Sequence, residues 1–316
     1  MEEFRGLVVK STGSWYEVEK DDRQRINARL KGKFRLKGLK STNPVAVGDF
    51  VRFHMEGEDG VIHTIEDRKN YIVRRSINLS KQIQIIAANI DQLFLVITIH
   101  HPPTTLGFVD RFLAAAEAYR IPAVLVYNKI DLYKTELQKE ELKRWKSIYE
   151  LAGYAQLEVS AEEKTGIEEL KTKMTGKTSI FSGHSGVGKS TLVNALDENF
   201  KLKTSEISDY HKTGKHTTTF AELFELPFGG KIIDTPGIKG FGTVELENEF
   251  LSHYFPEMRI RMKGCKFNNC VHINEPKCAV KEAVEAGEIA AERYENYLSI
   301  YHDDEREHHR AKGVRG

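Results

Sequence analysis

The sequence predicts an α/β protein in three parts: a small N-terminal β-barrel, a doubly wound α/β domain and a mainly helical C-terminal domain. Short strand-like segments crowd the first 70 residues. Strand and helix patterns then alternate up to about residue 240, and the strand pattern stops beyond that point. We therefore expect domains at residues 1–70, 71–240 and 241–316, which suits a chain of 316 residues.

The N-terminal part is rich in β-branched and aromatic residues separated by glycine turns. Strand patterns cover Leu7–Lys10, Trp15–Glu19, Val47–Phe53 and Gly60–Ile65. So many short strands favour a five-stranded OB-type barrel, a fold that often binds nucleic acid. Residues 1–40 hold 11 Lys or Arg against six Asp or Glu. We therefore expect the barrel to bind RNA, although an ordinary solvated surface would carry the same charges.

The middle of the chain alternates buried strands with amphipathic helices. Strands are predicted at residues 92–99, 122–127, 157–160, 178–182 and 231–234, and helices at 108–120, 136–152, 167–174 and 189–196. This alternation is typical of a mostly parallel, doubly wound sheet. In the C-terminal domain, residues 247–254 and 281–301 are predicted helices.

A phosphate-binding loop lies between the strand at 178–182 and the helix at 189–196. It consists of Gly183, His184, Ser185, Gly186, Val187, Gly188, Lys189 and Ser190, followed by Thr191, and matches G-x-x-x-x-G-K-[ST] in full. Its glycines let backbone amides approach phosphate oxygens at a helix N-terminus. We expect Lys189 to reach the β- and γ-phosphates and Ser190 to bind Mg²⁺. The alternative, a chance glycine-rich turn, would lack this strand and helix context.

Two later segments complete a nucleotide site of this type. Asp234 ends the last predicted strand, where its carboxylate can hold Mg²⁺ through water, and the amide of Gly237 can meet the γ-phosphate. Between the P-loop and Asp234, residues 214–219 include three adjacent threonines that suit a switch contact with Mg²⁺. The pattern leaves the choice among the three open, and we favour Thr218.

A guanine-reading loop precedes the P-loop in the chain. Its residues are Asn128, Lys129, Ile130 and Asp131, which match N-K-x-D directly after a buried strand. The carboxylate of Asp131 can accept hydrogen bonds from guanine N1 and N2, a pair of donors that adenine lacks. One helix later, Ser160 and Ala161 resemble the loop whose backbone contacts the guanine oxygen. The two loops together predict binding of GTP and GDP rather than of ATP.

The order of these motifs is circularly permuted. The guanine-reading loop precedes the P-loop by about 55 residues, and no second N-K-x-D follows Asp234. A permuted chain can build the same site because strands need spatial adjacency and not a fixed order.

Lys239 stands where many GTPases have a water-orienting Gln, so we expect slow intrinsic hydrolysis. We assign water positioning to His216, for which a structural role is the alternative, and expect Lys189, Thr218 and His216 to act in catalysis.

All three cysteines of the chain lie in one short segment. They are Cys265, Cys270 and Cys278, with His272 between the second and the third. An odd, clustered count does not suit a disulfide framework. Three thiolates and one imidazole are the ligands of a closed, tetrahedral structural Zn²⁺ site, and we expect one such ion per chain. Free cysteines beside a histidine are the alternative.

These motifs together resemble the bacterial ribosome small-subunit-dependent GTPase A family, which consists of circularly permuted GTPases. The matching features are Asn128–Asp131, Gly183–Thr191, Gly214–Thr219, Asp234–Gly237 and the cysteine and histidine knuckle, so that nearly the whole chain is covered. His184 stands where a Gln is usual, and Lys215 where an Arg is usual. Since backbone amides bind the phosphates, the first departure should matter little. The second bears on how the switch histidine is held.

The resemblance implies GTP hydrolysis stimulated by the small (30S) ribosomal subunit, in the late maturation of that subunit. It also implies binding near the decoding region, rRNA contacts from the flanking domains and a catalytic role for His216.

We expect a monomeric, cytoplasmic protein without a signal peptide, and the longest apolar run, residues 93–99, is too short to cross a membrane. The alternatives are a regulatory GTPase switch with a protein partner, and an RNA-binding protein that holds GTP but barely hydrolyses it.

Overall fold

The computed structural model describes residues 2–31, 44–75, 83–197, 221–234 and 246–313, with side chains described up to residue 303 in the last helix. These residues form two compact units, each assembled from separate stretches of chain. Unit 1 comprises Met1–Leu93, Ile167–Ser182 and Ser190–Lys239, and unit 2 comprises Phe94–Gly166, Gly183–Lys189 and Gly240–Gly316. Each unit is considered by itself below.

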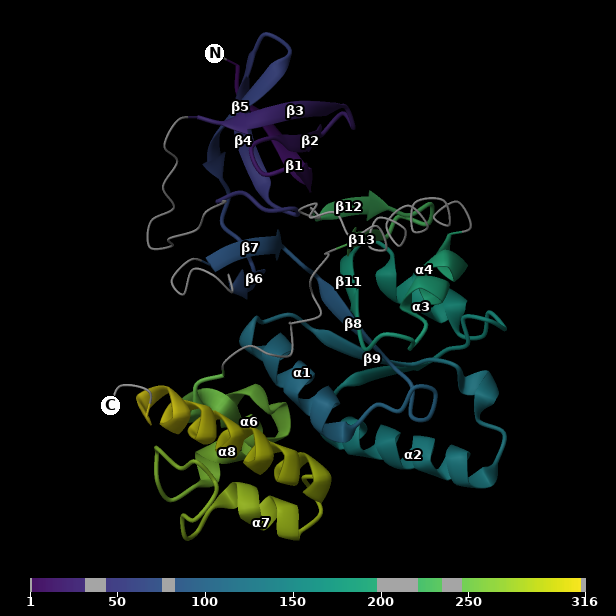
Figure 1. Ribbon diagram of the computed structural model, residues 1–316, viewed down its shortest axis with the longest axis vertical. Coiled ribbons are helices and arrows are strands. Elements are labelled where there is room, and N and C mark those ends of the chain that lie inside the picture. Colours follow the sequence, from purple (N-terminus) through teal and green to yellow (C-terminus); the bar gives the residue numbers. More distant parts are fainter. Residues whose placement is uncertain (1, 32–43, 76–82, 198–220, 235–245, 314–316) are drawn as a thin grey trace. The chain divides into compact units, whose positions relative to one another are not determined.

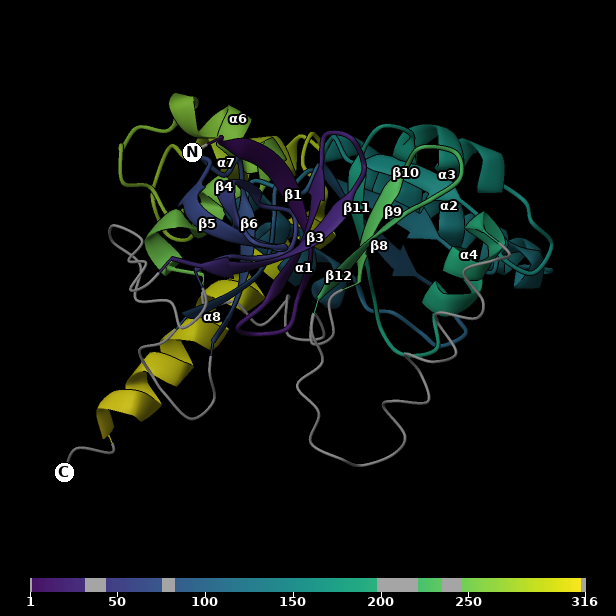
Figure 2. The same cartoon turned by 90° about the horizontal axis from the view of Figure 1, so that it is seen from above.

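Unit 1 contains the predicted barrel, which is confirmed. Its strands are β1 (Phe4–Ser11), β2 (Tyr16–Lys20), β3 (Arg25–Leu30), β4 (Phe50–Glu56) and β5 (Asp59–Ile65) (Figures 1 and 2). They pair in the order β1-β2-β3-β5-β4, and β1 also pairs with β4, which closes the sheet. The inward side chains, among them Val8, Val18, Phe53 and Ile62, are fully buried. This is the connectivity of a five-stranded Greek-key barrel.

Strand β3 has no counterpart among the predicted strands. Its outward positions are Arg25, Asn27 and Arg29, all exposed, whereas Ala28 between them is buried. Residues 25–30 alternate polar and apolar side chains, as a half-buried strand normally does. Four of the five barrel strands were predicted, and this alternation is the signal that indicates the fifth.

The rest of unit 1 belongs to the α/β part of the chain. Strands β6 (Tyr71–Arg75) and β7 (Ile83–Ala88) form an antiparallel pair. Strand β11 (Thr178–Ser182) runs parallel to β13 (Lys231–Asp234), and β12 (Glu222–Glu225) pairs antiparallel with β13 and touches β1. Helices α3 (Ile167–Met174) and α4 (Lys189–Leu196) have the predicted bounds. Strands β6, β7 and β12 were not predicted.

Unit 2 contains three neighbouring strands of the nucleotide domain, in the order β8-β9-β10. They are β8 (Gln92–Ile97), whose first two residues belong to unit 1, β9 (Ala123–Tyr127) and β10 (Ala155–Glu158). Strands β9 and β10 are parallel, with Tyr127 opposite Glu158, so their carboxyl ends meet at one edge. Helices α1 (Leu106–Ala118) and α2 (Glu136–Leu151) connect the strands, and both begin with a threonine cap. Loops that leave this edge can therefore build one site.

The C-terminal part of unit 2 is helical. Its elements are η3 (Asn248–Tyr254), α6 (Pro256–Arg261), η4 (Met262–Gly264), α7 (Ala279–Glu285) and α8 (Ala291–Gly313). Helix α1 packs against η3 and α8 (Figure 1). None of the described helices has the length and apolarity needed to span a membrane.

The helix predicted at residues 281–301 is in fact two helices. Helix α7 ends before Gly287, which has a positive φ of 72°. The amide of Gly287 donates to the carbonyl of Val284, and that of Glu288 donates to the carbonyl of Ala283. This pair of bonds is a Schellman cap, which a glycine in the left-handed conformation allows. A single glycine inside an amphipathic pattern was too weak a signal to place the break.

A buried ionic network joins the C-terminal helices to the nucleotide half of unit 2. Arg293 of α8 donates to both carboxylate oxygens of Glu257 at 2.8 and 3.0 Å, and to Asp110 of α1 at 2.8 Å. Asp110 also accepts from Asn296 at 2.6 Å and from the hydroxyl of Tyr149 at 3.0 Å. Burial opposes the charge on Arg293, but Asp110 and Glu257 raise its pKa well above the ordinary value.

Candidate nucleotide and metal sites

Asn128 lies where three loops of unit 2 meet. Its side-chain NH₂ donates to the carbonyl of Val187 in the P-loop at 2.8 Å, and its side-chain oxygen accepts from the amide of Ala161 at 3.3 Å. Its own amide donates to Ile97 at the end of β8. The side chain is 1% exposed. One residue therefore ties the guanine-reading loop to both the phosphate loop and the second base loop.

Lys129 makes a second connection between the same loops. Its ammonium donates to the carbonyl of Gly186 in the P-loop at 2.7 Å and to that of His101 at 2.8 Å. The residue has a positive φ of 61°, which is uncommon for a lysine. A residue in this conformation is strained unless its surroundings hold it, and here the two carbonyls hold the lysine side chain.

Asp131 is oriented by the second base loop. The hydroxyl of Ser160 donates to its carboxylate at 2.6 Å and accepts from the amide of Glu163 at 3.0 Å. Ser160 is fully buried, while Asp131 keeps part of its surface accessible. The carboxylate therefore has a fixed direction and still has accepting capacity for a base.

The P-loop conformation depends on two of its glycines. A Cβ on Gly183 would lie 2.1 Å from the carbonyl oxygen of Val96, and one on Gly188 would lie 2.4 Å from the side-chain nitrogen of Asn128. Both residues also have positive φ, 141° and 93°. No other residue type fits either position, because both the space and the backbone conformation exclude a side chain.

Lys189 folds back over the P-loop. Its ammonium donates to the carbonyls of Gly183 at 2.8 Å and His184 at 2.7 Å. The positive charge is thus held over the loop amides, which is where a phosphate bound by those amides would need it. Ser190 and Thr191 follow as exposed residues in the first turn of α4.

His184 packs against helix α1. Its ring centroid lies 3.6 Å from that of Phe108, with the rings tilted by 31°. Burial, and secondarily the charge of Lys189, lower the pKa of His184. The imidazole is therefore neutral near pH 7 and serves as a packing contact between the P-loop and α1.

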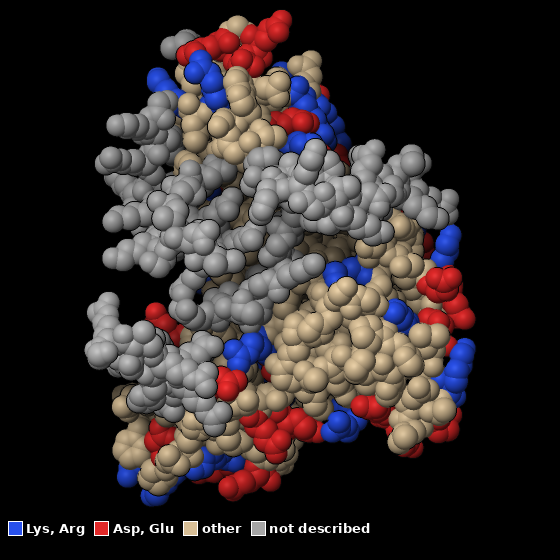
Figure 3. All heavy atoms as spheres, viewed as in Figure 1, with Lys and Arg blue, Asp and Glu red and all other residues tan. Residues whose placement is uncertain are grey.

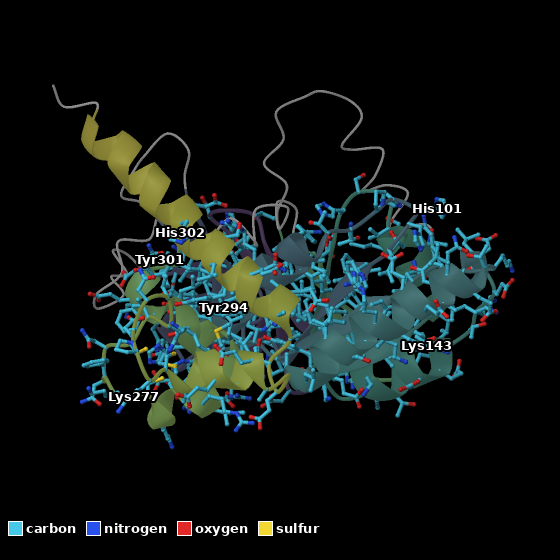
Figure 4. All side chains as sticks on the ribbon, turned by 90° about the horizontal axis from the view of Figure 1, so that it is seen from below. His101, Lys143, Lys277, Tyr294, Tyr301 and His302 are labelled. Atoms are coloured by element: carbon cyan, nitrogen blue, oxygen red, sulfur yellow. The ribbon has the colours of Figure 1, made fainter. Side chains whose placement is uncertain are left out.

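A loop that the motifs did not single out also borders the site. The chain leaves β8 at Thr98 and reaches α1 through His101 and two prolines. The carbonyl of His101 accepts from Lys129, and the hydroxyl of Tyr133 accepts from the amide of Ile99 at 2.9 Å. Figure 4 shows His101 at the edge of unit 2, far from Tyr294. Its position after a parallel strand, as for Asn128, was the signal that could have revealed it.

Several predicted site residues belong elsewhere or lie outside the described part of the chain. Asp234 ends β13 in unit 1, as the pattern indicated, and Ile130 begins the short helix η1 (Ile130–Leu132). His216, Thr218 and Gly237 are not among the described residues. Their roles stay predictions.

The knuckle residues converge on one point between η4 and α7. One ligand atom from each of Cys265, Cys270, His272 and Cys278 lies within 4.8 Å of all the others. His272 Nδ1 lies 3.3 Å from the sulfur of Cys278 and 3.6 Å from that of Cys265, and the two sulfurs are 3.9 Å apart. Ligand atoms of tetrahedral Zn²⁺ are about 3.5–3.8 Å apart, so these four side chains fit such an ion.

The surroundings of the knuckle also suit a metal. Burial raises the pKa of the Cys270 thiol to about 12, so thiolates in this place require a nearby cation. Helix α8 supports the ligand loop, because Tyr294 donates to the carbonyl of His272 and Tyr297 to that of Val271, each at 2.6 Å. Figure 4 shows Tyr294, on helix α8, and Lys277.

Comparison with known proteins assigns the chain to a family. The family described as RsgA GTPase matches residues 65–244, and the one described as RsgA N-terminal domain matches residues 5–62. The chain belongs to the RsgA GTPase family. Members of this family are hydrolases of GTP, and the fold prediction of a permuted GTPase domain with a barrel before it and a cysteine cluster after it is confirmed.

Relatives in the RsgA GTPase family are similar over almost the full length. The protein named small ribosomal subunit biogenesis GTPase RsgA from Christiangramia forsetii is 54% identical over 306 residues, which cover 96% of this chain and 97% of that one. The protein of the same name from Flavobacterium johnsoniae is 55% identical over 309 residues, covering 96% and 94%.

Two solved structures share the fold. YjeQ from Thermotoga maritima is 37% identical, with a TM-score of 0.78, and the match covers 96% of this chain and 98% of that one. YloQ, described as a circularly permuted GTPase, is 29% identical, with a TM-score of 0.77 and coverage of 97% and 96%.

Proposed function

We propose that this protein is a GTPase that binds the small ribosomal subunit and acts in its late maturation, hydrolysing GTP to GDP and phosphate with turnover stimulated by the subunit. The assignment of GTP binding rests on the contacts of Asn128 with Val187 and Ala161, which join the base-reading loops to the phosphate loop. The ribosomal part rests on relatives named small ribosomal subunit biogenesis GTPase RsgA, at 54% and 55% identity.

Different residues bind the base and the phosphates of the nucleotide. The oriented carboxylate of Asp131 accepts from guanine, and Lys129 lies along the base. The P-loop amides and Lys189 bind the β- and γ-phosphates. Mg²⁺ would neutralise phosphate charge, and Ser190, Thr218 and Asp234 would hold it directly or through water, while the amide of Gly237 would contact the γ-phosphate.

His216 is our candidate for positioning the attacking water. It is a polar residue in the switch segment, and the position of a water-orienting Gln holds Lys239 instead. Replacing His216 with Ala should lower turnover and leave nucleotide affinity unchanged, as measured by single-turnover hydrolysis and by titration with a fluorescent GTP analogue. Unchanged turnover would remove this role. Replacing Lys189 with Ala should instead abolish nucleotide binding.

The knuckle serves as a structural Zn²⁺ site in this proposal, with one ion held by Cys265, Cys270, His272 and Cys278. Support comes from the spacing of the four ligand atoms. The barrel and the C-terminal domain, which flank the GTPase domain, contact rRNA. The protein acts as a monomer in the cytoplasm, where ribosomal subunits are assembled.

The first test is GTP turnover by the purified protein alone, with small ribosomal subunits and with large subunits. Selective stimulation by small subunits supports the proposal as a whole. Slow turnover that neither subunit changes would remove the ribosome from it and would favour a switch with a protein partner. Binding of GTP without turnover under any condition would favour an RNA-binding protein that merely holds the nucleotide.

A further inference from the structure

The knuckle presents an aromatic ring on its outer surface. Phe267 lies between the ligands Cys265 and Cys270 and is 39% exposed. The ammonium of Lys266 lies 5.3 Å from the centroid of the Phe267 ring. Among the described residues, no other aromatic ring packs against it. The knuckle therefore displays a stacking surface that its own fold does not use.

Three exposed lysines belong to the same segment as this ring. The amide of Lys266 donates to the carbonyl of Lys277 at 3.2 Å, so these two residues are direct neighbours across the knuckle. Lys263 precedes them by one turn, and all three side chains are exposed. Within the described part of the chain none of the three pairs with a carboxylate. Figure 3 shows Lys and Arg side chains at the lower left, where the knuckle loop lies in Figure 1, with Asp and Glu side chains beside them.

The acidic residue of the same loop bonds to its own backbone and not to these lysines. Glu275 accepts hydrogen bonds from the amides of Val271, Ile273 and Asn274, at 2.8 to 3.1 Å. Burial opposes the charge, but these bonds lower the pKa of Glu275 below its ordinary value, so the carboxylate is ionised and directed to its own backbone. The outer surface keeps three cations and adds the exposed amides of Asn268 and Asn269.

The metal ligands fix the geometry of this surface. Lys266 directly follows Cys265, and Lys277 directly precedes Cys278, so both lysines lie next to residues held at the cluster. A surface held in this way loses little conformational freedom when it binds. An aromatic ring beside phosphate-binding cations is the arrangement by which proteins bind unpaired nucleotides.

We infer that the knuckle is a binding site for single-stranded RNA, in which an unpaired base stacks on Phe267 while Lys263, Lys266 and Lys277 contact the adjoining phosphates. The amide side chains of Asn268 and Asn269 reach the edge of the stacked base. This inference deepens the proposed function, because it states which form of RNA the C-terminal domain binds and with which residues. It rests on that proposal only for the source of the RNA.

The direct test places a fluorophore at the stacking position. In a Trp15→Phe background, Phe267→Trp leaves only the new indole and the buried Trp145, and a base stacked on the indole quenches its emission. Addition of a 12-nucleotide oligoadenylate should quench the fluorescence, and a 12-base-pair RNA duplex should quench it much less. No quenching under conditions in which fluorescence anisotropy shows the oligonucleotide bound, or no binding at all, would overturn the inference.

Affinity measurements on the full chain separate stacking from simple apolarity. Phe267→Leu keeps an apolar side chain and should weaken oligoadenylate binding by ~5- to 100-fold, whereas Phe267→Tyr should bind nearly as the native protein does. Phe250→Leu is the matched control, since Phe250 is 46% exposed in η3, outside the knuckle. Lys266→Ala and Lys277→Ala should each reduce the slope of log K against log salt by about 0.7. Equal affinities for Phe267→Leu and Phe267→Tyr would exclude stacking.

The outcomes distinguish this inference from the proposed function. Naked RNA is the probe, so binding that depends on Phe267 stands even if small subunits fail to stimulate GTP turnover. Stimulated turnover with no dependence of RNA binding on Phe267 leaves the proposed function intact and removes the inference. A third outcome is that Phe267→Leu loses stimulation of GTP turnover by small subunits while oligoadenylate does not quench the fluorescence of the Phe267→Trp protein. This outcome would assign the surface to a protein partner and would also overturn the inference.

Discussion

The barrel of unit 1 and the helical core of unit 2 use ion pairs in opposite ways. On the barrel, Arg25 reaches Glu17 and Glu19, each at 3.1 Å, and its side chain is 43% exposed. In unit 2, Arg293 reaches two carboxylates at similar distances but is only 1% exposed. Exposed pairs are screened by water and contribute ~0–1 kcal/mol, whereas breaking a buried pair strands a charge and costs ~3–5 kcal/mol.

This difference shows what each set of charges can do. Described arginines of the barrel, such as Arg5, Arg29 and Arg52, each contact a carboxylate of the same barrel, so much of their charge is already balanced. The buried pairs instead tie helix α1, which carries the P-loop contact Phe108, to helix α8, which supports the knuckle. The charges on the barrel lie at its surface, whereas the buried charges around Arg293 hold helices α1 and α8 together.

The largest effect is expected from Arg293→Met. Loss of the guanidinium leaves Asp110 and Glu257 buried without their cation and should lower the free energy of unfolding of unit 2 by about 3–5 kcal/mol. Urea unfolding followed by the emission of Trp145, in a Trp15→Phe background, reports this unit alone. Replacing all three charges in Arg293→Met/Asp110→Leu/Glu257→Met should recover most of the loss. A triple variant no more stable than the single one would contradict the role of the stranded carboxylates.

A smaller effect is expected from Tyr149→Phe. The change removes one hydroxyl that donates to Asp110 and should cost about 1.5–3 kcal/mol, the range for hydrogen bonds to charged groups. Tyr154→Phe is the matched control, because the Tyr154 hydroxyl is buried near Arg293 and has no hydrogen-bond partner among the described residues. This second change should be neutral or stabilising. The same urea titration measures both variants. Equal losses of unfolding free energy would contradict a stabilising hydrogen bond from Tyr149 to Asp110.

On the barrel, Arg25→Ala should change the free energy of unfolding by only about 0.2–1 kcal/mol, although it breaks two ion pairs at once. The effect should shrink further at high salt, because the pairs face solvent. Thermal unfolding followed by circular dichroism at low and high salt provides the measurement. A loss of unfolding free energy comparable to that of Arg293→Met would show that solvent exposure does not explain the difference between the two sets of ion pairs.

The smallest effect concerns pH and His184. Its pKa in the folded protein is lowered from the ordinary value of 6.5, so the unfolded chain binds protons more strongly near this pH. Its contribution to stability is therefore fully present above pH 6.5 and decreases as the pH falls below that value. His184→Gln should reduce the fall in the unfolding temperature of unit 2 between pH 7.5 and 5.5. Identical pH profiles for the two proteins would contradict the packing of a neutral imidazole on Phe108.

The sequence revealed features whose residues are close together in the chain. The P-loop, the guanine-reading loop and the knuckle are each fixed by a few neighbouring residues with strict spacing, and the structure brings the first two together through Asn128. Helices α3 and α4 and strand β13 also have the predicted bounds, because each has a clear apolar pattern.

Features that depend on distant residues could not be predicted in this way. Asp110 and Arg293 are 183 positions apart, and each looks like an ordinary surface charge on an amphipathic helix. Their burial follows from the packing of α1 on α8, which no local pattern encodes. The same holds for β12, a strand of four residues that forms only by pairing with β13 and β1.

The separation of Asp110 and Arg293 also sets an order of events during synthesis. A ribosome adding ~5–20 residues per second needs roughly 10–40 seconds to travel from Asp110 to Arg293. During that interval the nascent chain holds helix α1 and the guanine-reading loop without the arginine that neutralises Asp110. Unit 2 can therefore complete its core only after residue 293 has been added, and a nascent chain that stalls before this residue leaves the core open to chaperones and proteases.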